Sequence, residues 1–547
     1  MDSFDYVIVG GGSSGAIVAA RLAEAGHTVC LLEAGQSDRS PFVQVPAGFL
    51  KVIFDPNYTW GFNTEPVPGS NDRVIAMIQG KVLGGGGSVN GMAYTRGQAR
   101  DFDGWAQLGN PGWSYANVLP YFRRCERKTG AGDDTYRGRQ GNVGVKHLDW
   151  NNPLIDAFIE SAQKLGVPFN DDYNGAVQYG VGRYQFTIEN GHRMSAARAY
   201  LRSDVARRRI DLRLHAFAQC LMFDGQRVVG VRYRREGTDA LHEVRAGKEV
   251  ILCAGAANTV KLMQLSGIGP GAQLSQLGID TRLDLPGVGE NLQDHYVSRM
   301  VFGVKDAPTI NRMARGPSVI GHLVNWALGR PSMIGIGPIM GCLYGKSGAG
   351  ADALDTADYV LTFTPGSYKA GQMGKLDSVA GMTIGAYQLR PQSRGFVRLR
   401  SKNPMDAPII QTNYLAEEID RKVITEALKM CRRLANGQPL ARYCANESYP
   451  GEHVKTDQDV LEYARQQGSS GYHISGTCRM GPRNGPNGDK TAVVDAELRV
   501  HGLEGLRVAD TSIMPAITSG NTNAPVMMIA EKAADLILGK SLPPATL

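Results

Sequence analysis

The sequence predicts an α/β fold in which a sheet-based domain is combined with a second domain, each built from separate stretches of chain. Two observations support this: a strand, helix and strand pattern within the first 35 residues, and similar buried strands that return near the middle and the end of the chain. The 547 residues allow several structural units. Hydrophobic residues make up 42% of the chain, beside 68 glycines and 27 prolines, which indicates a globular protein with a large core and many turns.

The first predicted element is a βαβ unit. Residues 6–9 (YVIV) have the composition of a buried strand, residues 14–25 predict an alanine-rich helix, and residues 28–32 predict a second strand. The turn between the first strand and the helix reads GGGSSG and contains the spacing GxGxxG. A glycine motif in this position is typical of a Rossmann-like, dinucleotide-binding domain.

Each residue of the glycine motif has a physical role in such a site. Gly10 permits the tight turn, Gly12 lets the backbone approach a pyrophosphate at the helix N-terminus, and Gly15 lets the helix pack on the strand. Glu33 lies 18 residues beyond Gly15, at the end of the second strand, where it can accept hydrogen bonds from an adenosine ribose. The motif, the flanking elements and the acid together predict a dinucleotide site.

A second glycine-rich segment, GKVLGGGGSVN, occupies residues 80–90 after a long region rich in glycine, proline and aromatic residues. Four successive glycines are unfavourable inside a helix or strand, by roughly 0.5–1 kcal/mol each. This backbone is therefore expected to pass close to another group. A flexible linker is the alternative, but the apolar residues on both sides of the glycines favour an ordered segment.

Later elements indicate that the first domain is spread over the whole chain. Residues 249–253 and 506–510 predict further strands, whereas residues 300–390 are rich in glycine, methionine and aromatic residues without clear periodicity. Residues 415–436 predict an amphipathic helix, and we take the middle of the chain as a substrate-facing domain. The first domain is predicted to comprise residues 1–155, 190–300 and 465–547, and the second residues 156–189 and 301–464.

Charge and cysteine usage exclude several classes of protein. The net charge of +7 is a mild excess over so long a chain, and the densest basic run, residues 207–209, reads as a solvated face, so nucleic acid is not an expected partner. The eight cysteines include no CxxC pair, which favours a reduced, cytoplasmic protein. The N-terminus is acidic, and the apolar strand after it is too short for a signal or membrane helix. Peripheral association with a membrane stays open.

Several motifs together resemble the glucose-methanol-choline family of FAD-dependent oxidoreductases, over nearly the whole chain. The first is the N-terminal glycine motif with Glu33. The others are residues 80–90 continued by Tyr94, Gly97 and Asp103, residues 255–269, and the C-terminal segments 472–481, 506–510 and 521–525. Within the family, the similarity is closest to bacterial alcohol and choline dehydrogenases.

The resemblance implies a glucose-oxidase-like fold, in which a Rossmann-like FAD-binding domain is joined to a substrate-binding domain. It implies FAD contacts at Gly10, Gly12, Ser14, Gly15, Glu33, Ala34, Leu83, Gly84, Gly87, Asn90, Met92, Ala93, Ala218, Ala254, Asp510, Thr522 and Asn523. The segment GENLQDH at residues 289–295 also resembles a family hallmark, which we interpret as an interdomain packing element.

Alcohol oxidation by a flavin requires a base beside the reacting carbon, because the hydroxyl proton leaves as the hydride is transferred. His473 and Asn521 match the catalytic pair of the family. A neutral imidazole can accept the proton, so His473 is the expected base, whereas Asn521 can only hold the substrate oxygen by hydrogen bonds. A serine hydrolase is excluded because no GxSxG motif accompanies the histidine, and no cysteines or histidines have metal-ligand spacing.

The residue before Asn90 bears on how FAD is held. Some members of the family attach FAD covalently through a histidine at this position, but here the residue is Val89. Valine cannot form that bond, so the resemblance implies non-covalent FAD.

The substrate is expected to be a neutral, largely apolar primary alcohol. Choline-oxidising relatives carry a glutamate in a segment that we align with residues 336–344, which contain no carboxylate here and have Met340 nearest the expected acid. The electron acceptor is expected to be oxygen or a quinone-like carrier. Two alternatives stay open: a choline dehydrogenase or oxidase, and a flavoprotein with non-oxidative, photodecarboxylase-like activity. The presence of both His473 and Asn521 favours alcohol oxidation.

Overall fold

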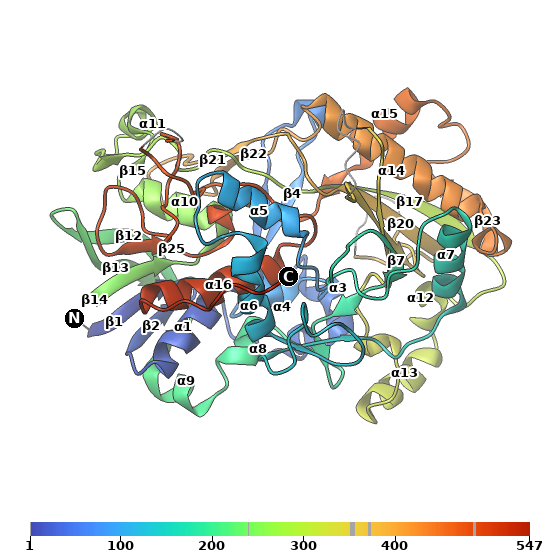
Figure 1. Cartoon of the computed structure of the whole chain (residues 1–547), viewed down its shortest axis with the longest axis horizontal. Coiled ribbons are helices and arrows are strands. Elements are labelled where there is room, and N and C mark those ends of the chain that lie inside the picture. Colours follow the sequence, from blue (N-terminus) through green and yellow to red (C-terminus); the bar gives the residue numbers. More distant parts are fainter. Residues whose placement is uncertain (1, 239, 350–355, 370–373, 485–487) are drawn as a thin grey trace.

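The computed structural model describes residues 2–238, 240–349, 356–369, 374–484 and 488–547. Two seven-stranded sheets organise this part of the chain. In Figure 1 the first sheet lies on the left, where the blue N-terminal and red C-terminal segments meet, and the second lies on the right beneath the orange helix α14 (Glu418–Asn436). The α/β class predicted from the sequence is confirmed.

The first sheet has the strand order β11, β2, β1, β14, β13, β12, and β25 also pairs with β14. The strands β11, β2, β1, β14 and β25 run parallel, whereas β13 and β12 extend the sheet as antiparallel neighbours. Their bounds are β1 Asp2–Val9, β2 Val29–Leu32, β11 Ile210–Arg213, β12 Ala216–Asp224, β13 Arg227–Arg235, β14 Leu241–Leu252 and β25 Leu506–Val508. The predicted βαβ unit is therefore present, and the late strands join it as expected.

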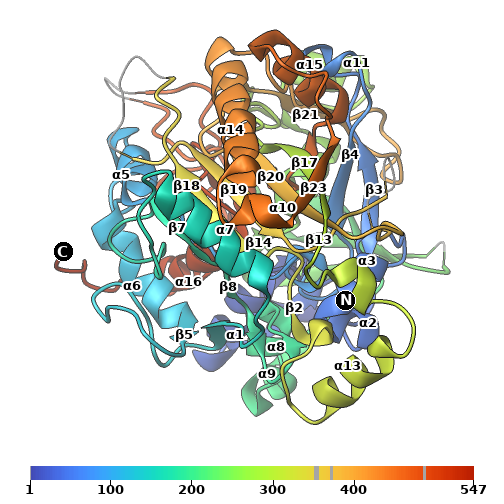
Figure 2. The same cartoon turned by 90° about the vertical axis from the view of Figure 1, so that its right-hand side faces the viewer.

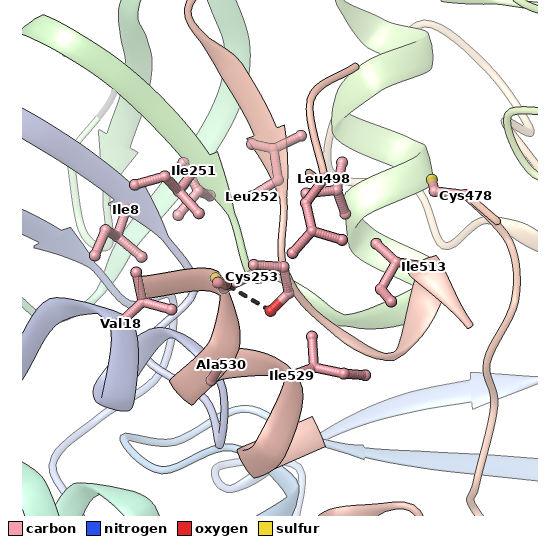
Figure 3. Close-up of a cluster of buried hydrophobic side chains, with 14 of the residues drawn as sticks. Ile8, Val18, Ile251, Leu252, Cys253, Cys478, Leu498, Ile513, Ile529 and Ala530 are labelled. Atoms are coloured by element: carbon pink, nitrogen blue, oxygen red, sulfur yellow. Dashed lines mark hydrogen bonds between the residues drawn. The ribbon is translucent and has the colours of Figure 1, made fainter. Parts of the chain in front are cut away.

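The core of this domain is completed by the end of the chain. Helix α1 (Gly15–Glu24) packs against α16 (Asn523–Ile537), and α16 packs in turn against α6 (Tyr115–Cys125). Figure 3 shows Ile8 and Val18 from the N-terminal unit together with Ile251, and with Ile529 from α16. Each fully buried aliphatic side chain of this kind contributes about 1.5–3 kcal/mol to stability. The C-terminal segment is therefore part of the N-terminal sheet's core.

The second sheet has the strand order β23, β17, β20, β19, β18, β7, and β24 pairs with β17. Their bounds are β7 Gly180–Arg183, β17 Tyr296–Val304, β18 Gly341–Gly345, β19 Tyr359–Thr364, β20 Gly381–Gln388, β23 Cys444–Tyr449 and β24 Ser469–Ser470. All eight residues of β20 are buried. A strand that is covered on both faces shows no alternation of apolar and polar residues, which is why residues 300–390 carry no periodic signal in the sequence.

Helices cover one face of the second sheet. Helix α14 (Glu418–Asn436), which the sequence predicts at residues 415–436, packs on β17, β19 and β20, with α7 (Pro153–Lys164) beside it. Figure 2 shows α14 and α7 in front of the strands of this sheet. The other long helices are α5 Ala99–Gln107, α10 Gly255–Leu265, α13 Ser318–Ala327 and α15 Asp457–Gln467. None of the helices in the described part of the chain has the length and apolar character needed to span a bilayer.

The sheets can be compared with the predicted domain ranges. All strands of the first sheet fall within the ranges given to the first domain. Two elements of the second sheet do not fall within its own ranges: β17 begins at Tyr296, and β24 lies at Ser469–Ser470. The strand β21 (Phe396–Arg398) packs on α10, although its residues belong to the predicted second domain. The exact boundaries between the domains stay a prediction.

Candidate active site

A cavity begins at the carboxyl ends of β1, β2 and β14 and continues to the second sheet. Residues of β17, β19 and β20 also line it, as do residues that follow β24 and precede α16. Most of the predicted cofactor contacts lie in its wall: Gly10, Gly12, Ser14, Glu33, Ala34, Asn90, Met92, Ala93, Ala218, Ala254, Asp510, Thr522 and Asn523. His473 and Asn521 line the same cavity. One continuous space therefore joins the predicted dinucleotide site to the predicted catalytic pair.

Four of the predicted cofactor residues, Gly15, Leu83, Gly84 and Gly87, do not line the cavity but lie behind its wall. A Cβ on Gly15 would lie 1.9 Å from the carbonyl oxygen of Gly10, so this glycine allows α1 to pack against the end of β1. The N–H of Gly84 donates to the carbonyl of Gly11 at 2.7 Å. These positions shape the backbone of the wall, and their own atoms face protein.

The two glycine-rich segments lie against each other. Gly85 has a φ of +53°, and a Cβ on it would lie 2.8 Å from the Cα of Gly12. The Ser13 hydroxyl donates to Oδ1 of Asn523 at 2.8 Å and so links the start of α1 to the start of α16. The expectation that the second glycine segment passes close to another group is therefore confirmed, and that group is the first glycine loop.

The first glycine loop has the chemistry that a pyrophosphate requires. The N–H groups of Gly12, Ser13 and Ser14 donate to no other described residue. They lie in the cavity wall at the N-terminus of α1, where helix N–H groups and the helix dipole favour an anion. These residues therefore fit the diphosphate of a dinucleotide such as FAD.

Glu33 and Asp510 are buried carboxylates that both bind backbone N–H groups. Glu33 accepts from Gly11 at 2.8 Å and from Gly35 at 2.7 Å. Asp510 accepts from the N–H of Gly255 at 2.8 Å and from Thr259 Oγ1 at 2.6 Å. Desolvation raises the pKa of each carboxyl, against these hydrogen bonds. Glu33 thus fixes the first glycine loop as well as facing the cavity, a role that the ribose interpretation alone does not include.

His473 and Asn521 come together at the other end of the cavity. The Nδ2 atom of Asn521 lies 3.0 Å from Nε2 of His473, although the two residues are 48 positions apart. The hydroxyl of Thr95 donates to Oδ1 of Asn521 at 3.4 Å, which assigns the amide nitrogen to the histidine side. The predicted pair is therefore in direct contact.

His295 determines which nitrogen of His473 carries the proton. Nε2 of His295 lies 3.0 Å from the carbonyl oxygen of Leu389, to which it can only donate, and Nδ1 of His295 lies 2.9 Å from Nδ1 of His473. Burial lowers the pKa of His295 to about 4, so this ring is neutral and its Nδ1 is an acceptor. His473 must then donate from Nδ1, which leaves the lone pair of its Nε2 directed toward Asn521.

The neighbouring Asp294 fixes the backbone beside His473. Its carboxylate accepts from the N–H of His473 at 2.7 Å, from Ser470 Oγ at 2.5 Å and from the hydroxyl of Tyr414. Burial raises the pKa of Asp294 to about 6, whereas these hydrogen bonds favour its ionised form. Asp294 therefore holds the main chain that carries the histidine.

The segment at residues 289–295 thus does more than pack between domains. Its last two residues, Asp294 and His295, orient the backbone and the ring of His473. Sequence reasoning assigned neither residue to the site. The signal that was available is an adjacent acid and histidine within a family hallmark, since buried titratable groups of this kind are enriched at functional sites.

Comparison with known proteins agrees with this geometry. Residues 4–297 and 391–530 match the two parts of the GMC oxidoreductase family model. The chain is 39% identical over 541 residues to the oxygen-dependent choline dehydrogenase of Sinorhizobium fredii, covering 98% of this chain and 96% of that protein. Pyridoxine 4-oxidase from Mesorbium loti is 29% identical with a TM-score of 0.85, covering 97% and 98% of the two chains. Formate oxidase from Aspergillus oryzae is 25% identical with a TM-score of 0.90, covering 98% of each.

The fold and these matches define a class, the flavin-dependent oxidoreductases that act on CH–OH donors. Within that class, the chain belongs to the GMC oxidoreductase family. It is an FAD-binding flavoprotein, and the uncommitted N–H groups of the first glycine loop fit the FAD diphosphate. The family and the cofactor implied by the sequence motifs are confirmed.

Release of FAD by acid is expected from the identity of Val89. This residue is 4% exposed at the end of α4 (Gly86–Val89), lines the cavity, and packs with Val43, Val52 and Val82. Its side chain has no atom that can form a covalent bond to a flavin. Precipitation of the holoprotein with trichloroacetic acid should leave the yellow colour in the supernatant. Colour that remains in the washed pellet would show a covalent attachment.

Proposed function

We propose that this protein oxidises a primary alcohol to the aldehyde, with His473 as the general base. The observation that carries the proposal is the hydrogen bond from Nδ1 of His473 to His295, which leaves Nε2 as an acceptor beside Asn521 in the cavity wall. When bound, FAD supplies the acceptor for the hydride of the alcohol carbon. His473 accepts the hydroxyl proton at Nε2, and a positioned base of this kind contributes about a hundred- to ten-thousandfold.

Asn521 orients the alcohol. Its Nδ2 can donate to the substrate oxygen while Oδ1 stays bound to the hydroxyl of Thr95. An amide neither gains nor loses a proton near neutral pH, so this residue contributes position and leaves proton transfer to His473. In this proposal the first domain, residues 1–155, 190–300 and 465–547, binds FAD. The second domain, residues 156–189 and 301–464, mainly binds the substrate.

Oxidation of choline is the second candidate, because the most similar relatives above include a choline dehydrogenase at 39% identity. The charges in the cavity wall oppose it, although Trp60 and Tyr472, which could form part of an aromatic cage, also line the cavity. Among the described residues that line the cavity, the carboxylates are Glu33 and Asp510, and both already bind backbone N–H groups at the dinucleotide end. A quaternary ammonium needs a carboxylate or an aromatic cage to offset its lost hydration.

Residues 336–344, which we align with the glutamate-containing segment of choline-oxidising relatives, line the cavity only in part. Pro338 and Ile339 line it, whereas Met340 is 3% exposed and belongs to the core of the second sheet. Met340, the residue nearest the expected acid, therefore lies outside the cavity wall, and the apolar surface comes from its two neighbours. The similarity to an oxygen-dependent choline dehydrogenase supports oxygen as the electron acceptor, and a quinone-like carrier is the alternative.

Anaerobic reduction of the bound flavin tests the proposal. The absorbance of oxidised FAD should be lost in the dark when benzyl alcohol or 1-octanol is mixed with the holoenzyme, and admission of oxygen should restore it. Choline at the same concentration should act more slowly. A flavin that stays oxidised with every alcohol would reject alcohol oxidation and favour the non-oxidative, light-driven alternative.

The pH profile should extend to unusually acidic conditions for a histidine base. Burial, followed by the neighbouring His295, lowers the pKa of His473 well below its usual value of 6.5. The ring therefore stays neutral, and able to accept a proton, until the pH falls through this lowered value. A profile of kcat/KM against pH should show its acidic limb well below pH 6.5. An acidic limb at or above that value would contradict the assignment.

A further inference from the structure

Arg299 brings a positive charge to the substrate side of the cavity. It lies on β17 (Tyr296–Val304) opposite Gly385 of β20, and both residues line the cavity together with His473. A Cβ on Gly385 would lie 2.7 Å from Oγ1 of Thr362, so the absence of a side chain there makes room for this hydroxyl, and Cγ of Arg299 lies beside the same position at 3.5 Å. Arg299 therefore extends across the sheet surface that faces the cavity.

The charge of Arg299 has no carboxylate partner among the described residues. Its Nη1 donates to the hydroxyl of Ser469 at 2.8 Å, and the phenols of Tyr368, Tyr463 and Tyr472, which are neutral near pH 7, lie near it. Burial lowers the pKa of Arg299, yet a guanidinium remains protonated near neutral pH. A desolvated cation without an anion is unfavourable, and an anionic ligand would offset that cost.

Other buried arginines have more partners within the described part of the chain. Arg96 and Arg137 both bind the carboxylate of Glu126. Arg193 has no acid partner among the described residues and its Nη2 is without a hydrogen bond there, but it donates to the main-chain carbonyls of Val43, Gly87 and Asn90. Within the described ranges, the side chain of Arg299 has a single hydroxyl partner and lines the cavity, so a purely structural role leaves most of its five donors unexplained.

We propose that Arg299 binds a carboxylate of the substrate, so that the preferred substrate is a primary alcohol with an anionic end. This inference rests on the proposed alcohol oxidation and refines its substrate. Thr362 and Thr383 also line this part of the cavity, but their hydroxyls donate to the carbonyls of Gly385 and Gly366. The phenol of Tyr368 can assist a carboxylate, whereas Pro338 and Ile339 offer an apolar surface. The expected class is a hydroxy acid whose hydroxymethyl group is separated from the carboxylate by an aromatic or short aliphatic spacer.

The charge also determines what the cavity rejects. A guanidinium that is desolvated in the wall repels a quaternary ammonium and attracts a carboxylate, and like charges at close range cost several kcal/mol in interfaces. The neutral apolar alcohol expected from the sequence alone is therefore replaced by an anionic one. The argument against choline becomes stronger, because an opposing charge is present in addition to a missing acid.

A matched pair of substrates tests the inference. The ratio of kcat/KM for 4-(hydroxymethyl)benzoate to that for benzyl alcohol is measured with the holoenzyme and with Arg299→Met, Arg299→Lys and the exposed control Arg208→Met. The wild type and the control should prefer the carboxylate at least about thirtyfold, a value typical of a buried charge pair. Arg299→Met should remove the preference, and Arg299→Lys should keep part of it. Equal ratios in the wild type and Arg299→Met would overturn the inference.

A binding measurement separates this inference from the proposed function. Benzoate should perturb the visible spectrum of bound FAD in the wild type, with a dissociation constant at least about thirtyfold weaker in Arg299→Met. If benzoate binding depends on Arg299 but no alcohol reduces the flavin, the carboxylate site stands and alcohol oxidation is wrong. If alcohols reduce the flavin but neither the substrate ratio nor benzoate binding depends on Arg299, the oxidation stands and the carboxylate site is wrong. Should Arg299→Met lose FAD, the kcat/KM ratios of the two substrates in the wild type and in Arg299→Lys decide whether the carboxylate site is present.

Discussion

Replacement of His473 by alanine is expected to reduce alcohol turnover by at least about two orders of magnitude, while FAD stays bound. Nε2 of His473 is the atom that accepts the proton, because Nδ1 of the same ring donates to His295. The neighbouring amide of Asn521 has no basic nitrogen, so no other group at this position takes over the proton. The loss should appear in kcat and in kcat/KM alike, because the proton leaves in the transition state.

Stopped-flow reduction of the flavin under anaerobic conditions measures this step directly. The exposed His453→Ala serves as a matched control and should reduce at the wild-type rate. Asn521→Ala should also be impaired, with an oxidised flavin spectrum that stays largely unchanged. Near-normal reduction in His473→Ala would mean that another group accepts the proton.

Substitution of His295 by leucine is expected to lower kcat by about ten- to a hundredfold, although this residue need not touch the substrate. Leucine removes the acceptor for the Nδ1 proton of His473 and also the donor to the carbonyl of Leu389. His473 can then exchange its tautomer or turn its ring, so that Nε2 is less often the free acceptor. A positioning residue acts on kcat in this way while leaving the bound cofactor intact.

His295→Gln provides the conservative test. A glutamine side chain offers one acceptor and one donor, as the neutral imidazole does, and should restore a large part of the activity that leucine removes. The acidic limb of the pH profile should stay below pH 6.5 in His295→Leu, because burial is the largest cause of the lowered pKa of His473. Reduced stability with an unchanged kcat would indicate a role in packing alone.

Features that depend on neighbouring residues could be predicted from sequence spacing. The turn between β1 and α1 depends on contacts within a few residues, so the spacing of Gly10, Gly12 and Gly15 is enough to indicate a dinucleotide loop. The roles of His473 and Asn521 were implied only by resemblance to a family, since the residues are 48 positions apart and no local rule links them. Periodicity identified α14 because one of its faces is solvated, and it failed for β20 because both faces are buried.

The sequence by itself therefore determined the class of fold, the family, the cofactor and a proposed catalytic pair. Only the tertiary structure decided how that pair is oriented and what surrounds it. His295 reaches His473 across 178 residues because β17 pairs with β24 directly before the histidine. The same strand carries Arg299 into the cavity, where its environment depends on Gly385 from β20 and Ser469 from β24. The hydrogen bonds of His473, its tautomer and the environment of Arg299 all depend on such long-range strand pairings. A local sequence pattern does not show which strands pair.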